Sequence, residues 1–135
     1  GVKPMSKSYL VYQLKPSVYK KIDDESYVSD LVYKLMMLDL STVDTVVSEA
    51  IANDMFQPAM FIHLGVLSRH KDPLEEVFDA GNSYGSSGTR VVSINKPTSL
   101  SVGNLVVHLQ DNVVYACMPT GWHKLSQALV LGIKL

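Results

Sequence analysis

Residues 103–125, GNLVVHLQDNVVYACMPTGWHKL, decide the fold that this sequence predicts. Two runs rich in Val, Leu and Tyr, Leu105–Leu109 and Val113–Cys117, flank the polar residues 110–112. Such runs favour β-strands that are buried on at least one face. Pro119 should end the second strand, because proline has no N–H to donate to a ladder. The stretch is therefore predicted to form a β-hairpin.

The turn of this hairpin is expected at Asp111-Asn112, since both residue types tolerate the left-handed backbone of a two-residue turn. This turn would place His108 opposite Tyr115. Side chains alternate across a sheet, so the register sorts them into two faces. The first is entirely apolar and carries Leu105, Val107, Leu109, Val114, Ala116 and Met118. The second is mixed and carries Val106, His108, Gln110, Val113, Tyr115 and Cys117.

We expect the apolar face to lie against the core. The mixed face is too apolar for plain solvent, and either the helical part of the chain or another chain should cover it. If it is a contact surface, its members are the side chains of Val106, His108, Val113 and Tyr115, together with Trp122 at the following turn. Aromatic residues beside apolar ones are typical of the centre of an interface.

Composition places the chain among globular proteins: it has 135 residues, 47% of them apolar and 19% charged. One domain is the natural count for this length. No apolar run approaches the roughly 20 residues that span a bilayer. One cysteine excludes a disulfide within the chain. Together with the absence of an N-glycosylation acceptor, it favours an intracellular setting.

Charge is unevenly spread along the chain. Residues 1–21 hold five Lys and no acid, whereas residues 22–81 hold twelve acids against three basic residues. The acidic block argues against a nucleic-acid surface on the helical part. The N-terminal lysines suit either an acidic partner or a strand edge protected against aggregation, and the second interpretation is favoured.

Apolar spacing of three and four residues predicts helices over about 25–38, 42–54 and 73–80. Met36 and Met37 extend the apolar surface of the first helix and are interpreted as core. Asp72-Pro73 begins the last helix with a cap and a proline at its first position, and we expect Val77 and Phe78 to face inward. Residues 59–67 are ambiguous between strand and helix, and Pro58 favours a helix over about 59–69.

Strands are predicted over about 8–14, 90–94, 105–110, 113–117 and 128–134. The fold class is thus α+β, with three or four short helices packed on a mainly antiparallel sheet. The segment 82–89, NSYGSSGT, separates a mostly helical part from a mostly strand part. It is interpreted as a linker between subdomains, a lid or a long connection.

The sequence shows no pattern of catalysis, metal binding or cofactor binding. The four histidines have no metal-ligand spacing, and no glycine-rich phosphate loop or nucleophile elbow is present. The one candidate nucleophile is Cys117, with His108 or His123 as its base. We favour the alternative that Cys117 is a small buried side chain.

The hairpin resembles the trimerisation domain of the multiplexin collagens, the endostatin-bearing kind, and similar modules of phage fibre proteins. Gly103, Leu105, Val106 and Val107 are similar to its first strand, Val113, Val114 and Tyr115 to its second, and Gly121, Trp122, Lys124 and Leu125 to its end. The resemblance implies a small α/β unit that assembles as a trimer without enzymatic activity. The 80 residues of helical sequence before it, and the lack of a collagen repeat, depart from that family.

The sequence therefore favours a non-enzymatic module for protein interaction or oligomerisation, acting within a larger assembly. The alternatives are a processed viral or phage structural or accessory protein, suggested by the non-Met start, and a small hydrolase that uses Cys117 and His123.

Overall fold

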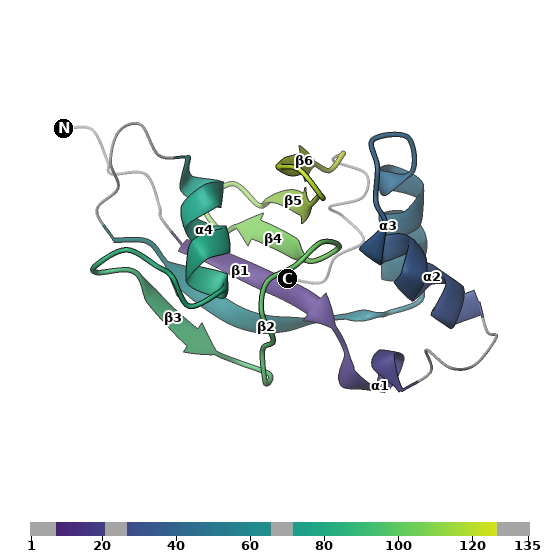
Figure 1. Cartoon of the computed structure of the whole chain (residues 1–135), viewed down its shortest axis with the longest axis horizontal. Helices are drawn as coiled ribbons and strands as arrows, with labels where there is room; N and C mark the ends of the chain where they lie inside the picture. Colours follow the sequence, from purple (N-terminus) through teal and green to yellow (C-terminus); the bar gives the residue numbers. More distant parts are fainter. Residues whose placement is uncertain (1–7, 21–26, 66–71, 127–135) are drawn as a thin grey trace.

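A six-stranded antiparallel sheet forms the centre of the protein, in a computed structural model that describes residues 8–20, 27–65 and 72–126 (Figure 1). The strand order is β3-β2-β1-β4-β5-β6. The elements in chain order are β1 (Ser8–Leu14), α1 (Pro16–Tyr19), α2 (Tyr27–Met36), α3 (Val43–Ala52), β2 (Phe56–His63), α4 (Pro73–Gly81), β3 (Arg90–Ser93), β4 (Leu105–His108), β5 (Val113–Cys117) and β6 (Trp122–Lys124). The predicted α+β class is confirmed.

Two apolar clusters cover the two faces of the sheet. On one face, α2 and α3 pack against β1, β4 and β5, with side chains such as Leu35 and Val47 against Leu105 and Val107. On the other face, α4 packs against β1, β2 and β4. Figure 1 shows α4 in front of the sheet and the α2–α3 pair at one end of it. Each cluster contains residues from both sides of segment 82–89.

The predicted helix over 59–69 is wrong for residues 59–63, because residues 56–63 form β2 between β1 and β3, and its last part, 66–69, lies outside the described residues. The ladder to β1 pairs Tyr12 with Pro58 but Val11 with Met60, so Ala59 is an extra residue at a bulge. A bulge is one of the few places where a sheet accepts proline. Pro58 therefore marks an irregular strand here, not the first turn of a helix.

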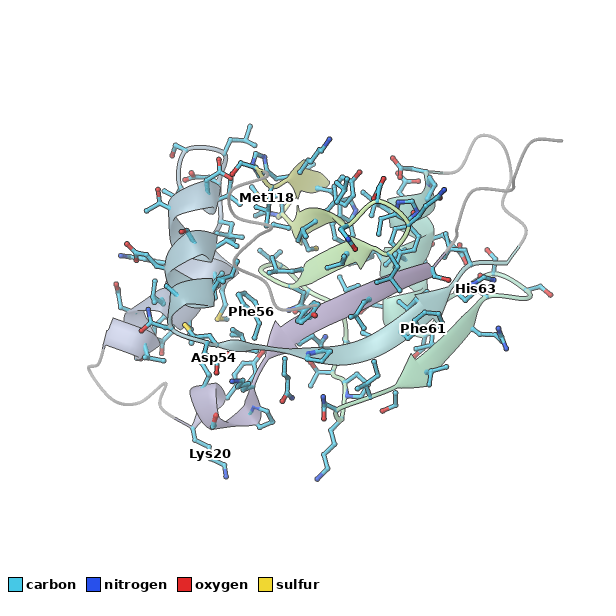
Figure 2. All side chains as sticks on the ribbon, turned by 180° about the vertical axis from the view of Figure 1, so that it is seen from behind. Lys20, Asp54, Phe56, Phe61, His63 and Met118 are labelled. Atoms are coloured by element: carbon cyan, nitrogen blue, oxygen red, sulfur yellow. The ribbon has the colours of Figure 1, made fainter. Side chains whose placement is uncertain are left out.

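Figure 2 views the sheet from behind, with α4 on the far side. Phe56 lies near the α2–α3 pair and packs partly against its cluster, whereas Phe61 lies toward the other end of β2. Phe61 stands opposite Val92 of the edge strand β3, and all four residues of β3 are exposed. The α2–α3 pair therefore covers only part of this face.

The hairpin forms as predicted, but its register differs by two residues. His108 pairs with Val113, not with Tyr115, which instead pairs with Val106. Asn112 has a φ of 57°, but Asp111 does not have the positive φ that the expected turn also requires. The connection is the four-residue loop 109–112, in which the Asp111 carboxylate accepts a hydrogen bond from the Val113 N–H at 3.1 Å.

A shift of two residues leaves the side chains of β4 and β5 on their predicted faces, because the period of a strand is two, whereas Leu109 and Gln110 lie in the loop. The apolar face lies against α2 and α3, as expected. Val106 and Cys117, on the mixed face, belong to the cluster that α4 completes. The helical part of the chain thus covers much of the mixed face. The predicted strand over 128–134 lies outside the described residues.

Gly103 shows why the stretch begins with glycine. Its φ is +89°, and a Cβ there would lie 2.6 Å from the backbone oxygen of Leu35. Only glycine accepts both the left-handed backbone and this close approach to α2. The hairpin is thereby placed directly against the end of the helix.

Candidate functional site

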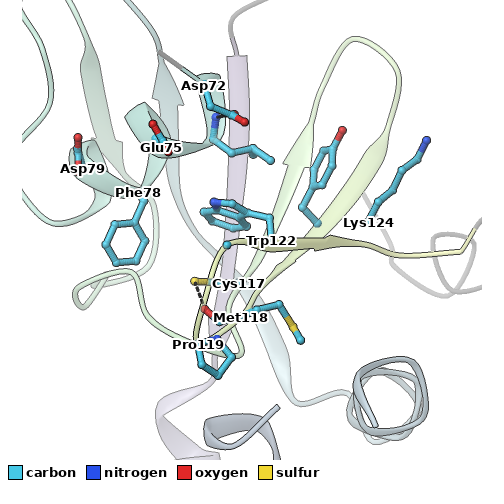
Figure 3. Close-up of a pocket in the computed structure, with 12 residues that line it drawn as sticks. Asp72, Glu75, Phe78, Asp79, Cys117, Met118, Pro119, Trp122 and Lys124 are labelled. Atoms are coloured by element: carbon cyan, nitrogen blue, oxygen red, sulfur yellow. Dashed lines mark hydrogen bonds between the residues drawn. The ribbon is translucent and has the colours of Figure 1, made fainter. Parts of the chain in front are cut away.

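A groove of about 690 Å³ lies between α4 and the β5–β6 edge of the sheet (Figure 3). Side chains of α4 and its N-cap form one wall, and those of β5, β6 and the turn between them form the other. The lining residues are Asp72, Leu74, Glu75, Phe78, Asp79, Tyr115, Cys117, Met118, Pro119, Gly121, Trp122 and Lys124. We call this feature the α4–β6 groove.

The sequence of α4 fixes which side chains face the groove. The Asp72 side chain accepts a hydrogen bond from the Leu74 N–H at 2.8 Å and caps the helix, as predicted. Val77 is fully buried against the sheet. Phe78, which was expected to face inward, is instead 39% exposed and lines the groove. At 100° per residue, Phe78 is turned away from Val77 and shares a side with Glu75.

A buried carboxylate holds α4 to the following loop. Glu76 is fully buried and accepts hydrogen bonds from the backbone N–H of Ser86 at 2.5 Å, the Ser86 hydroxyl at 2.9 Å and the Thr89 hydroxyl at 3.0 Å. Segment 82–89, which the sequence left open as linker, lid or connection, is thus tied to α4 by several hydrogen bonds. These hydrogen bonds hold α4, which forms one wall of the groove, in place.

The opposite wall follows from the turn after β5. Gly121 has a φ of +74°, and its carbonyl accepts a hydrogen bond from the Met118 N–H at 3.0 Å. This turn pairs Trp122 with Cys117 and places the indole beside α4. Trp122 is half-buried and packs against the cluster under α4. One face of the indole is therefore held in place while the rest lines the groove.

Negative charge dominates the groove. Asp72, Glu75 and Asp79 stand along one wall, and Lys124 is the one cationic side chain among the lining residues within 8–20, 27–65 and 72–126. Burial raises the pKa of Tyr115, and the charges of Asp111 and Asp72 raise it further. The negative charge of Asp72 thus disfavours ionisation of the Tyr115 hydroxyl in the opposite wall.

The predicted interface residues divide into two groups. Val106 and His108 are buried inside the domain, where the His108 ring stacks on Tyr9 with centroids 4.9 Å apart. Val113, Tyr115 and Trp122 are half-buried, and the last two line the groove. The sequence thus named two aromatic residues of the groove but none of the α4 wall. Asp72 and Glu75 were visible only as part of a favourable helix start, and no pattern in the sequence singled out Asp79.

Cys117 and His123 do not come together. His123 pairs with Ala116 and contacts Asp44 of α3 at 3.2 Å, on the face opposite Cys117. Burial raises the pKa of the Cys117 thiol to about 11, so very little thiolate is present at neutral pH. Its Sγ lies 3.9 Å from the backbone oxygen of Met118 (Figure 3). This environment does not activate a nucleophile.

A second surface lies on α2 and the α2–α3 connection. Met36 and Met37, interpreted from the sequence as core, are 57% and 76% exposed. Tyr33 and Leu40 are also exposed, and Leu40 reaches 77%. We call these four residues the α2–α3 surface. It adjoins an open groove of about 580 Å³, which Tyr33 and Met37 help to line.

In the part of the chain that the structure describes, no cluster of His, Cys, Asp and Glu is suited to a metal ion. No helix within the same residues is long and apolar enough to cross a membrane. No protein-family model, curated protein or solved structure matches the chain at a significant level. The similarity of residues 103–125 to the multiplexin trimerisation domain stays a prediction.

Proposed function

We propose that this protein is a non-enzymatic interaction module that binds a segment of a partner protein in the α4–β6 groove. The observation that carries the proposal is the arrangement of Phe78, Tyr115 and Trp122 around one open groove. Aromatic side chains of this kind supply most of the binding energy in many interfaces, because they bury a large area with few rotatable bonds.

Both walls of the groove are suited to binding without rearrangement. The α4 wall is anchored by Val77 and by the hydrogen bonds of Glu76. The other wall belongs to the β5–β6 ladder. A preformed groove binds more tightly than a flexible one, since less conformational entropy is lost on binding. The groove is also large enough for several side chains of a bound segment.

Selection from a library of short random peptides tests this function. The wild-type protein should enrich a related set of sequences. The Phe78→Ala and Trp122→Ala variants should bind the selected peptides at least tenfold more weakly, because truncating an aromatic anchor costs about 2 kcal/mol or more. Tyr33→Ala, an aromatic truncation on the α2–α3 surface, is the matched control and should bind normally. Failure of the wild type to enrich any peptide, or equal binding by all variants, would contradict the proposal.

Assembly with further copies of this chain through the α2–α3 surface is a second candidate. The exposure of Met37 and Leu40 favours it, because contiguous exposed apolar side chains are typical of contact surfaces. Sedimentation equilibrium should then show concentration-dependent association that Met37→Asp and Leu40→Asp abolish. A monomer at all concentrations would rule it out.

A further inference from the structure

We infer that the partner segment bound in the α4–β6 groove is basic, an extended stretch whose Lys or Arg side chains lie between the carboxylates of α4 and the aromatic rings of the opposite wall. This inference rests on the proposed function and names the chemistry of the partner. It follows from the charge of the groove, the spacing of its acids and the position of its rings.

Charge complementarity favours a cationic occupant. Among the residues that the structure describes, the lining holds the three carboxylates of Asp72, Glu75 and Asp79 and the ammonium group of Lys124. An acidic segment would bring like charges together in a partly desolvated groove, which costs several kcal/mol at close range. A neutral segment would displace water from the carboxylates and bring no opposite charge in its place. A basic segment replaces that lost hydration with ion pairs.

The acids are spaced for an extended chain. Residues 72, 75 and 79 follow one another at intervals of three and four, so they recur along one side of the helix axis. Their Cα atoms span roughly 10 Å along α4. Side chains at alternate positions of an extended peptide are about 7 Å apart on one side. Two basic residues separated by one residue would therefore fall within the reach of this acidic wall.

The rings complete the site for a cation. Phe78 stands on the acidic wall, and Trp122 of β6 stands opposite it (Figure 3). Tyr115 of β5 also lines the groove on the side of the sheet. A Lys ammonium or Arg guanidinium group is attracted to the face of such rings, most strongly to tryptophan, within about 6 Å of the centroid. The apolar stem of the same side chain would cover Leu74 and the rings. Acids alone would attract any cation, whereas the rings favour one on an apolar stem.

Trp122 is the only tryptophan of the chain, so its fluorescence reports directly on the groove. The probes are three peptides without aromatic residues, in which alanine alternates with lysine, glutamine or glutamate. The lysine peptide should change the fluorescence in a saturable way, with an affinity that falls as salt rises. The glutamine and glutamate peptides should bind at least tenfold more weakly.

The double variant Glu75→Gln/Asp79→Asn tests the acidic wall. It should weaken binding of the lysine peptide about tenfold, since two exposed ion pairs together contribute about 1–2 kcal/mol. The matched control is Asp30→Asn/Glu49→Gln, which removes the same charge from the groove beside the α2–α3 surface. It should change the affinity less than twofold.

Three results would overturn the inference. Equal or tighter binding of the glutamine or glutamate peptide would place an uncharged or acidic segment in the groove and leave the proposed function standing. Equal weakening by both double variants would show a general effect of net charge. If no peptide changed the fluorescence, a basic segment would be excluded as the ligand of the groove. The proposed function would then be tested by the library selection alone.

Discussion

The two faces of the sheet are closed in different ways. On one face, α2 and α3 bury a large apolar cluster that includes Leu31, Leu35 and Val47. On the other, the single short helix α4 supplies few apolar side chains, and the buried polar residues Glu76 and His108 lie on its side. The pair of helices covers its part of the sheet mainly by apolar packing. A single nine-residue helix needs polar anchors and leaves a groove at its side.

A second polar anchor lies beside the same cluster. Gln13 and Asn104 are buried and joined by a hydrogen bond of 3.0 Å. The Gln13 side chain also bonds the backbone of Thr98 through both its oxygen and its nitrogen, and Asn104 accepts from the Ser101 N–H. These bonds tie the connection between β3 and β4 to β1. In the described residues every buried side-chain nitrogen and oxygen has a partner.

The largest expected effect is on the face closed by packing. Leu35 is almost fully buried in the cluster under α2 and α3. Leu35→Ala should lower the free energy of unfolding by about 2–5 kcal/mol, because it removes buried apolar area and leaves a cavity. Urea denaturation measures the loss. A change below about 1 kcal/mol would mean that this cluster is less tightly packed than the structure indicates.

Alkaline pH should lower the stability of the protein through Cys117 and Tyr9, which lie on the face of the sheet that α4 covers. Burial raises the pKa of Cys117 from 9.0 to about 11, and that of Tyr9 from 10.0 to about 12, with smaller effects from Tyr115 and nearby acids. Between those values the unfolded chain has lost protons that the folded chain keeps, so stability falls as pH rises from 9 to 12. Two pKa units correspond to roughly 3 kcal/mol at most for each group.

The double variant Tyr9→Phe/Cys117→Ala should flatten this alkaline loss. Its free energy of unfolding, measured in urea at a series of pH values, should fall less between pH 9 and 12 than that of the wild type. An identical pH dependence in both proteins would assign the loss to other groups. Neither substitution should alter the pH dependence below pH 8, where both groups are protonated in the folded and unfolded states.

Glu76 tests the polar anchor. Glu76→Ala removes the acceptor for Ser86 and Thr89 and should lower stability by about 1–3 kcal/mol, because these partly buried donors lose their partner. Hydrogen exchange at the Ser86 amide should accelerate. Glu75→Gln, at the exposed neighbouring position, is the control and should change stability by less than about 0.5 kcal/mol. Equal losses of stability in the two variants would show that Glu76 does not hold the loop to α4.

The smallest expected effect concerns the α2–α3 surface. Met37 and Leu40 are among the most exposed apolar side chains of the described residues. Met37→Ala and Leu40→Ala should each change the stability of the monomer by less than about 0.5 kcal/mol. A loss above about 1 kcal/mol, measured by urea denaturation, would show that these side chains contribute to folding, and the surface would then be part of the core.

Local patterns in the sequence predicted most of the elements. Alternation in the hairpin gave the correct faces even though the register was shifted by two, because a shift by an even number conserves the face. Capping residues located α4, and apolar spacing located α2 and α3. The strand β2 was missed because a bulge accommodates Pro58, and a bulge depends on the partner strand.

Only one wall of the α4–β6 groove could be predicted, because the other wall depends on contacts between distant parts of the chain. Tyr115 and Trp122 belong to a local pattern that the sequence displays. The acids and Phe78 of α4 come from some 40 residues earlier in the chain. They meet the hairpin only because α4 packs across β1 and β4, which local periodicity does not encode. Met36 and Met37 show the converse, since apolar character alone does not say that a side chain is buried.

Chemical-shift mapping of the ¹H–¹⁵N spectrum during titration with the alternating alanine–lysine peptide shows which surface of the protein binds a basic segment. We expect shifts confined to the α4–β6 groove, at residues 72–79, 115–119 and 121–124, and no shifts at residues 33–40. Shifts centred on the α2–α3 surface, or spread evenly over the acidic side chains of the whole molecule, would contradict this expectation.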